Sequence, residues 1–473
     1  MVMRNILYLA PLWSLLAFLA ILFPTLPAVA EAPQQISLEE VIKQAKSAGP
    51  GVVAARSRVQ AAHATHQQAL SYRWPEVRLE ESWIRTDSPA DVFGLLLNQE
   101  RFSFPAFVSG NPNQPEALKT SHTRLEVKWP LWTGGEIAAK IDQAGQLLSA
   151  AQALAQHHGN EVGYEAAFAW LDLKEAQESL GALEAAVRSA EAHAVRLARL
   201  LEQGMALRAD LLASEVHVAE LRDRLSQTQR QAHLAEARLA FLTGTSPETA
   251  WVPSELPDPP QIPGPLKAWL PQITGRADLR ARQRELDAVR LAVQIEKNRG
   301  LPRLGLLVQY HLYDERLFGT HGDSRTVAVQ AALPLFDGGR RRASEAEAAA
   351  RLAAGEAELR SFADRLSLQA KMAWAQTHDA FSRWQTARAA ILQAEEARRL
   401  VVERFEAGLE TNSRVLEALA IEQETHLRAV RARIESWRAR LGFLSALGVE
   451  PEVAVNLDLT NELANKIQME AER

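Results

Sequence analysis

A seven-residue phrase that occurs twice constrains this chain more than any other feature. Residues 129–135 read Trp-Pro-Leu-Trp-Thr-Gly-Gly, and residues 333–339 read Leu-Pro-Leu-Phe-Asp-Gly-Gly. Each phrase ends an alternating, strand-like run and precedes a very long helical run, which ends at Gly204 or Gly408. The separations agree, since 338 − 134 = 204 and 408 − 204 = 204. We interpret this agreement as an internal duplication of strand, turn, long helix, tip and returning helix.

The duplicated signals define two kinds of chain reversal. The prolines and glycines of the two phrases are expected to form strand-to-helix turns: Pro130, Gly134, Gly135, Pro334, Gly338 and Gly339. The later signals, Gln-Gly-Met at 203–205 and Ala-Gly-Leu at 407–409, are expected to form the tips between a long helix and the helix that returns from it.

Composition excludes several classes of function. The formal net charge is −5 over 473 residues, which gives no basic surface for nucleic acid. The chain has no cysteine, so disulfides, thiolate metal sites and a cysteine nucleophile are excluded. Gly-rich phosphate loops and Gly-x-Ser-x-Gly phrases are absent, which argues against an enzyme. His63 and His66 offer two imidazoles on one helix face, without an evident third metal ligand.

The N-terminus has the pattern of a secretory signal. Arg4 supplies a positive start, residues 12–23 are apolar, and Ala28-Val29-Ala30 resembles a cleavage site. No later apolar run approaches the ~20 residues that a membrane-spanning helix requires. The pattern therefore predicts an exported chain, which can enter a membrane only as a closed barrel, because open sheet edges cannot face lipid.

The remaining chain divides into two repeats. We expect a signal peptide (1–30), a first repeat (31–244), a Pro-rich linker without regular structure (245–271), a second repeat (272–448) and a weakly patterned tail (449–473). In the first repeat a single helix is expected over about 37–73. A loop is expected over about 87–121, and Asp210 is expected to open the returning helix. In the second repeat, helices are expected from about 275 to 299 and from Arg340 onward.

Four runs of about ten residues alternate between apolar and polar side chains. They cover residues 76–85, 125–131, 304–312 and 327–335. This length crosses a bilayer as a tilted strand, with the apolar side towards lipid and the polar side towards a lumen. Four strands are too few to close a barrel, for which about eight are needed. The sequence therefore predicts that further copies of the same chain complete it.

The long helices carry charge along their whole length and keep a coiled-coil seam of 3/4 spacing, so they are expected to project into the aqueous compartment.

These features together resemble the TolC-type outer-membrane efflux proteins. The resemblance covers about Ser37 to Gly448 and includes the tip phrase Arg-Phe-Glu-Ala-Gly-Leu at 404–409. It implies an α-helical periplasmic barrel joined to a membrane β-barrel of twelve strands, four from each protomer of a homotrimer. It also implies an outer-membrane location with a periplasmic extension.

The resemblance implies an exit duct for efflux or type I secretion rather than an enzyme. Its partners would be outer-membrane lipid, a periplasmic adaptor and an inner-membrane pump, with neither nucleic acid nor a cofactor. The tips that dock the adaptor would comprise Gly204, Met205, Phe405, Gly408 and Leu409. The periplasmic gate would comprise Asp210, Glu410, Arg414 and Glu417. We hypothesise that Asp210 pairs with Arg414 across the tip while Glu417 faces the lumen.

Two alternatives differ in class from a channel. A periplasmic adaptor also uses long helical hairpins, but adaptors carry one hairpin between compact β domains, whereas this chain predicts two hairpins and four spanning strands. A structural coiled coil would leave the alternating strands without a role. The cargo stays open among drugs, metals and secreted proteins, because specificity of this kind lies mostly in the pump.

Overall fold

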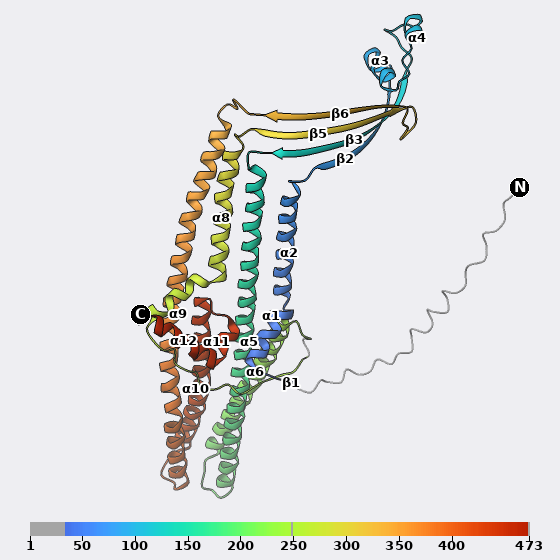
Figure 1. The fold of residues 1–473 in the computed structure, drawn as a ribbon. Coiled ribbons are helices and arrows are strands. Elements are labelled where there is room, and N and C mark those ends of the chain that lie inside the picture. Colours follow the sequence, from blue (N-terminus) through green and yellow to red (C-terminus); the bar gives the residue numbers. More distant parts are fainter. Residues whose placement is uncertain (1–33, 247–248, 472–473) are drawn as a thin grey trace, which may run out of the picture.

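The computed structural model describes residues 34–246 and 249–471 and shows long, nearly parallel helices that carry a sheet at one end (Figure 1). The predicted signal peptide, residues 1–30, lies outside the described residues. Within the described residues no helix is both long and apolar enough to cross a membrane.

Two helical hairpins of equal size form most of the molecule. The first contains α5 (Glu136–Glu202) and α6 (Arg208–Thr243), and the second contains α9 (Arg340–Glu406) and α10 (Asn412–Leu447). The long helices each have 67 residues and the returning helices each have 36. Their starts differ by 340 − 136 = 204 and 412 − 208 = 204 residues, which matches the separation of the repeated phrases.

A second pair of elements repeats with a different separation. Helix α2 (Pro50–Ser71) leads into β2 (Glu76–Thr86), and helix α8 (Ala277–Asn298) leads into β5 (Arg303–Asp314). Both helices have 22 residues, and the starts differ by 277 − 50 = 227 and 303 − 76 = 227. Each half of the chain therefore builds the same helix–strand corner.

The single helix expected over 37–73 is a wrong prediction. The chain forms α1 (Leu38–Ala48) and α2, with a break at Gly49. Proline at position 50 excludes helical backbone from the preceding residue, and Gly49 accordingly has a ψ of 134°. Ser37 caps α1 with a capping box to Glu40, which places the helix start where the sequence indicates it.

The four predicted strands are confirmed and form one antiparallel sheet in the order β2-β3-β5-β6, where β3 is Leu118–Trp132 and β6 is Gly322–Ala332. The fourth strand ends three residues earlier than expected, before Pro334, which has no N–H to donate. Each of the edge strands β2 and β6 pairs with only one neighbour within the chain.

The loop expected over 87–121 is also a wrong prediction. This segment contains the helices α3 (Pro89–Asn98) and α4 (Phe104–Ser109), at the end of the sheet far from the long helices (Figure 1). Phe93, Phe102 and Phe107 pack together with ring centroids 5.3 to 5.6 Å apart. Aromatic packing of this kind orders the segment despite its prolines and glycines.

The linker and the tail are more regular than the sequence indicates. The linker contains β4 (Trp251–Pro253), which pairs in parallel with β1 (Gln34–Ile36), and a short helix, α7 (Leu266–Trp269), followed by the 3₁₀ helix η1 (Leu270–Gly275). The tail forms α11 (Pro451–Val455) and α12 (Leu457–Ala471). The expectation of an irregular linker was wrong, because its apolar side chains gain a buried surface from the long helices.

The hydrophobic core lies where these segments surround the middle of α5 and the end of α10. The indoles of Trp170, Trp269 and Trp437 are fully buried there. Each indole N–H reaches a backbone carbonyl: Trp170 donates to Ile36 at 3.0 Å, and Trp437 donates to Pro257 at 2.9 Å. The core therefore ties the N-terminal strand and the linker to the long helices.

The two strand-to-helix turns have the same backbone conformation but differ in what surrounds them. Gly134 and Gly135 have φ values of 64° and 82°, and Gly338 and Gly339 have 69° and 87°. A Cβ added to Gly134 would lie 2.5 Å from the Cβ of Leu301, whereas one added to Gly338 would meet nothing within 4 Å. The first turn is packed against the α8–β5 corner, and the second has no such partner in the chain.

This difference predicts unequal effects of alanine at the two turns. Gly338→Ala carries only the strain of a positive φ, about 1 kcal/mol. Gly134→Ala adds an overpacking cost of about 1–3 kcal/mol against Leu301. We expect Gly134→Ala to lower the unfolding temperature of the separated single chain in detergent clearly more than Gly338→Ala does, as measured by circular dichroism. Equal falls in the unfolding temperature of the two variants would contradict this account of the first turn.

Candidate functional site at the helix tips

The two hairpin tips have the same local geometry. Gly204 and Gly408 adopt φ values of 72° and 74° at corresponding positions. The N–H of Met205 donates to the carbonyl of Leu200 at 2.8 Å, and the N–H of Leu409 donates to that of Arg404, also at 2.8 Å. Left-handed glycines at these positions reverse the chain at the end of each long helix. The predicted tip residues thus occupy both chain reversals.

The predicted pairing of Asp210 with Arg414 is wrong within one protomer. Arg414 Nη1 instead lies 2.6 Å from Glu417 Oε2, three residues further along α10. Residues three apart on a helix are neighbours, so this contact forms without help from the other hairpin. Glu410 lies 3.5 Å from Arg404 across the turn of the second tip. These charges are therefore satisfied locally, on the second hairpin.

A buried polar cluster joins the two tips instead. Asn412, at the start of α10, donates from Nδ2 to the backbone carbonyl of Asp210 at 3.0 Å and lies 3.4 Å from Ser214 Oγ. Its Oδ1 lies 2.8 Å from His193 Nε2 on α5. All three side chains, of Asn412, Ser214 and His193, are buried. One amide therefore connects the second hairpin to both helices of the first.

The hydrogen bonds determine which imidazole nitrogen carries the proton. Because the Asn412 amide group donates to a carbonyl, its Oδ1 must accept, and His193 Nε2 must donate. Burial lowers the pKa of His193 below its usual range, and Arg196 on the same helix lowers it further. Neutral His193 is therefore the form that the packed tip favours.

Two further contacts support this connection. The guanidinium of Arg196 on α5 forms an ion pair with Glu406, the last residue of α9. The Phe405 ring meets the His193 ring edge-on, with centroids 5.5 Å apart. Phe405, which was predicted to belong to the tip, thus packs against the polar cluster.

Sequence analysis missed His193, Ser214 and Asn412. One signal was available for His193, because Ala190, His193 and Leu197 keep the 3/4 spacing of the helical seam. A polar residue at a seam position requires a partner, but the sequence does not identify a partner 219 residues away.

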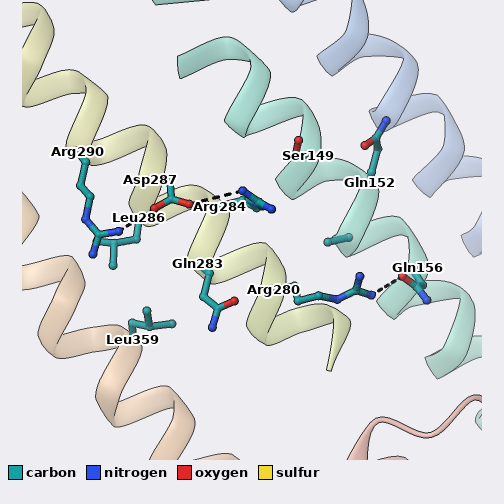
Figure 2. A pocket seen from close by; sticks show the side chains of 11 residues that line it. Ser149, Gln152, Gln156, Arg280, Gln283, Arg284, Leu286, Asp287, Arg290 and Leu359 are labelled. Atoms are coloured by element: carbon teal, nitrogen blue, oxygen red, sulfur yellow. Dashed lines mark hydrogen bonds and ion pairs between the residues drawn. The ribbon is translucent and has the colours of Figure 1, made fainter. Parts of the chain in front are cut away.

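A groove of about 740 Å³ lies between α5 and α8, away from the tips (Figure 2). Several of its polar groups already have partners: Arg280 donates to Gln156 at 2.6 Å, Arg290 donates to Asp287 at 2.7 Å, and Ser149 donates to the Gly145 carbonyl at 3.1 Å. The groove brings together no hydroxyl and base, and no pair of carboxylates, among the residues that line it. It has the chemistry of a helix–helix contact.

Comparison with known families assigns this architecture. The family model for outer membrane efflux proteins matches residues 41–245 and 272–449. The chain belongs to the outer membrane efflux protein family. This efflux protein is detectably similar to no curated protein. The family is one of channels rather than of enzymes.

Solved structures share the fold of this efflux protein at low sequence identity. A membrane protein from Pseudomonas aeruginosa is 20% identical with a TM-score of 0.75, covering 87% of this chain and 93% of that one. The outer membrane protein VceC from Vibrio cholerae is 20% identical with a TM-score of 0.72, covering 87% and 96%. The CmeC outer membrane channel of Campylobacter jejuni is 13% identical with a TM-score of 0.74, covering 91% and 89%.

Family and fold together establish what this efflux protein does. It is an outer-membrane exit duct for efflux. Its strands form one sheet at one end of the long helices, and its two hairpins end at the tips.

The pKa of His193 predicts that acid weakens the connection between the tips. As the pH falls through about 6.5, an exposed imidazole takes up a proton before a buried one does, so acid favours the opened tip. His217 on α6, whose pKa burial also lowers, faces the same cluster and acts in the same direction. We expect spin labels at Met205→Cys and Leu409→Cys to show a longer, broader distance distribution at about pH 5.5 than at about pH 7.5.

Pulsed EPR on trace-labelled protein measures this change, and the absence of native cysteine keeps both labels unambiguous. Replacing His193 by Gln keeps a donor and an acceptor but removes the titration. We expect the pH response to shrink in His193→Gln, and an unchanged response in that variant would exclude His193 as its main origin.

Proposed function

We propose that three copies of the mature chain, formed after removal of residues 1–30, assemble into a closed duct that is gated at its periplasmic tips. Each protomer contributes two structural repeats to the duct, residues 31–244 and 272–448, which the linker 245–271 joins. A periplasmic adaptor docks at the tips, and an inner-membrane pump supplies the energy. The unpaired edges of the four-stranded sheet carry this proposal.

The sheet edges require partners because of their location. In lipid, each backbone N–H or C=O without a partner costs several kcal/mol, so an open edge is not tolerated. Strand β2 has eleven residues, as has β6, and each leaves one side unpaired in the single chain. Pairing β6 of one protomer with β2 of the next satisfies both edges, and three copies give twelve strands with a passable lumen.

The internal repeat predicts the register of this contact. Within the chain, Leu125 of β3 pairs with Tyr310 of β5. The repeat maps β3 onto β6 by adding 204 and β5 onto β2 by subtracting 227, so Leu125 maps to Val329 and Tyr310 maps to Trp83. Val329 should therefore face Trp83 of the neighbouring protomer, and both are exposed in the single chain.

The second strand-to-helix turn supports the same contact. The first turn packs on the α8–β5 corner at Leu301, and the repeat maps Leu301 onto Trp74 at the α2–β2 corner. Trp74 is 71% exposed, and Phe336 in the second turn is 91% exposed. Exposed apolar groups of this size beside both edge strands of one protomer are expected where copies of a chain pack together.

The gate follows from the contrast between the two ends of the duct. The strands are held by continuous backbone pairing, whereas the tips are held by a few side-chain contacts around Asn412. We infer that Asp210, Glu410, Arg414 and Glu417 set the charge of the constriction. Met205 and Leu409, which are 65% and 68% exposed, offer apolar contacts to the adaptor, beside the turns at Gly204 and Gly408.

The predicted register makes a cross-linking test specific. We expect the variant Trp83→Cys with Val329→Cys to form a covalent trimer on mild oxidation in outer membranes, seen by gel electrophoresis without reductant. Directly opposed residues of antiparallel strands lie about 5 Å apart, within reach of a disulfide. The chain has no other cysteine, so each cross-link can be assigned.

Two matched controls accompany this test. Leu125→Cys with Tyr310→Cys is the internal counterpart and should cross-link while keeping the mass of one chain. Trp83→Cys with Arg325→Cys is four residues out of register, on the order of 13 Å, and should form no cross-link and keep the mass of one chain on the gel. A covalent trimer only with the out-of-register pair would refute the predicted register, and none with either pair would refute the closed trimer.

The tip cluster predicts a leaky variant. Asn412→Ala removes the donor to the Asp210 carbonyl and leaves His193 without its buried partner, at a cost of about 1–3 kcal/mol. A cost near 1.4 kcal/mol shifts the ratio of open to closed tips about tenfold. We expect a clear increase in the conductance of Asn412→Ala in planar bilayers. Arg208→Ala is the control, since Arg208 is the exposed repeat counterpart of Asn412 (208 + 204 = 412), and its conductance should not change. Equal conductance in both variants would remove the cluster from the gate.

A further inference from the structure

The polar face of the sheet carries an unusual group of rings. On β3, Leu125, Val127 and Trp129 belong to one face of the sheet, so the even-numbered residues belong to the other. Strand pairing places His311 opposite Arg124 and Tyr313 opposite His122, all on this polar face. Two histidines from strands 189 residues apart in sequence therefore meet on one surface.

The two imidazoles are in direct contact. His122 Nε2 lies 2.8 Å from His311 Nδ1, and the rings are inclined by 18° with centroids 5.1 Å apart. The Tyr313 ring stacks on His122 at 4.4 Å with an inclination of 4°. Backbone pairing of the two strands and this stacking hold the two imidazoles next to each other.

We propose that His122 and His311 form a binding site for a borderline divalent transition-metal ion, with Cu²⁺ as the best-fitting candidate. Neutral imidazole is a good ligand for copper, nickel and zinc, and copper binds most strongly in this series. Two imidazole nitrogens about 2.0–2.1 Å from one ion, at the right angle of a square-planar centre, lie about 2.9 Å apart. The 2.8 Å separation is that of the present hydrogen bond, in which the two nitrogens face each other, so the rings must turn before both lone pairs reach one ion.

The neighbouring charges do not oppose a cation. The guanidinium of Arg124, the nearest basic group on the same face, forms an ion pair with Glu80 on β2. Glu126, two residues further along β3, lies beside Lys128 and accepts a hydrogen bond from Gln309. Basic groups near the site are thus balanced by carboxylates, and the two imidazoles supply the ligands.

Metal binding needs no net release of a proton. In the present contact one imidazole donates its N–H to the lone pair of the other. When the ion enters, that proton moves to the second nitrogen of its own ring through water, and both facing nitrogens then bind the metal as neutral ligands. Water completes the coordination sphere, since the two imidazoles form an open edge rather than a closed cage.

The position of this site in the duct rests on the proposed function. In a closed barrel the polar face of the sheet lines the lumen. The repeat maps His122 onto Thr326 and His311 onto Ile84, so each protomer carries one such pair, and a trimer carries three. Each site would line the path of the cargo.

Direct titration tests the site itself. We propose titrating Cu²⁺ into the detergent-solubilised full chain, purified without a histidine tag and followed by calorimetry and continuous-wave EPR. We expect one nitrogen-ligated Cu²⁺ per protomer that is sensitive to His311. Loss of a second-shell partner alone weakens metal binding about 10- to 100-fold, so removal of a ligand in His311→Ala should weaken binding at least about tenfold.

Control variants separate this site from other histidines, since the chain contains 12. His63→Ala with His66→Ala removes another closely spaced pair and should leave the affinity unchanged. Equal affinities in the wild-type protein and His311→Ala would overturn the proposal and leave the pair as a hydrogen-bonded contact. A Cu²⁺-dependent fall in bilayer conductance that His311→Ala abolishes would further support it. Binding without this effect would retain the site and count instead against the lumen position, which belongs to the proposed function.

Discussion

The requirement that every backbone polar group in the membrane has a hydrogen-bond partner governs the whole structure. In the sheet order β2-β3-β5-β6, only the inner strands β3 and β5 are paired on both sides. The backbone groups on the outer sides of β2 and β6 would need a partner in lipid. A soluble sheet protects its edges with charge, proline or a covering segment. An edge in lipid must be paired, so in our proposal the smallest complete unit of this fold is larger than one chain.

Duplication provides the complementary surfaces for this closure without a separate interface. Inside the chain, β3 precedes the long helix α5 and β5 follows the shorter helix α8. Their pairing already shows how these two types of strand fit together. The same two strand types stand at the free edges, and the turns beside them have the same backbone angles. In our proposal both turns make the same kind of contact. Gly134 makes it with Leu301 of its own chain, and the turn at Gly338, which has empty surroundings in the single chain, makes it with a neighbouring copy.

Sequence reasoning succeeded where the signal was local and repeated. The start of α9 at Arg340 and the end of α6 before Gly244 follow from glycine signals and helical spacing. It failed at Gly49, where proline at the next position broke a pattern that was otherwise helical. It also failed wherever order comes from tertiary contact, as in the ring cluster around Phe93 or the paired strand at Trp251.

The tip shows the same limit most clearly. The predicted gate charges lie near the turns, but long charged side chains find partners close by, as Arg414 does with Glu417. The contact that joins the hairpins uses short, uncharged groups: an amide, a hydroxyl and a neutral imidazole. No spacing rule relates His193 to Asn412, because their proximity depends on how two hairpins of equal length lie side by side.

This arrangement confines movement to one end of the molecule. Strand pairing fixes the sheet end through many backbone hydrogen bonds, and the tryptophan core around Trp170 fixes the middle. Among the described residues beyond that core, the buried hydrogen bonds that join the tips of the two hairpins centre on one side chain, Asn412. Breaking part of a buried polar contact costs free energy, because polar groups then stay buried without a partner. Once water reaches all of these groups, the net cost is small. Such a contact therefore favours two states, joined or separated, over gradual loosening. A duct that must stay closed until a partner arrives needs this behaviour at its entrance and rigidity elsewhere.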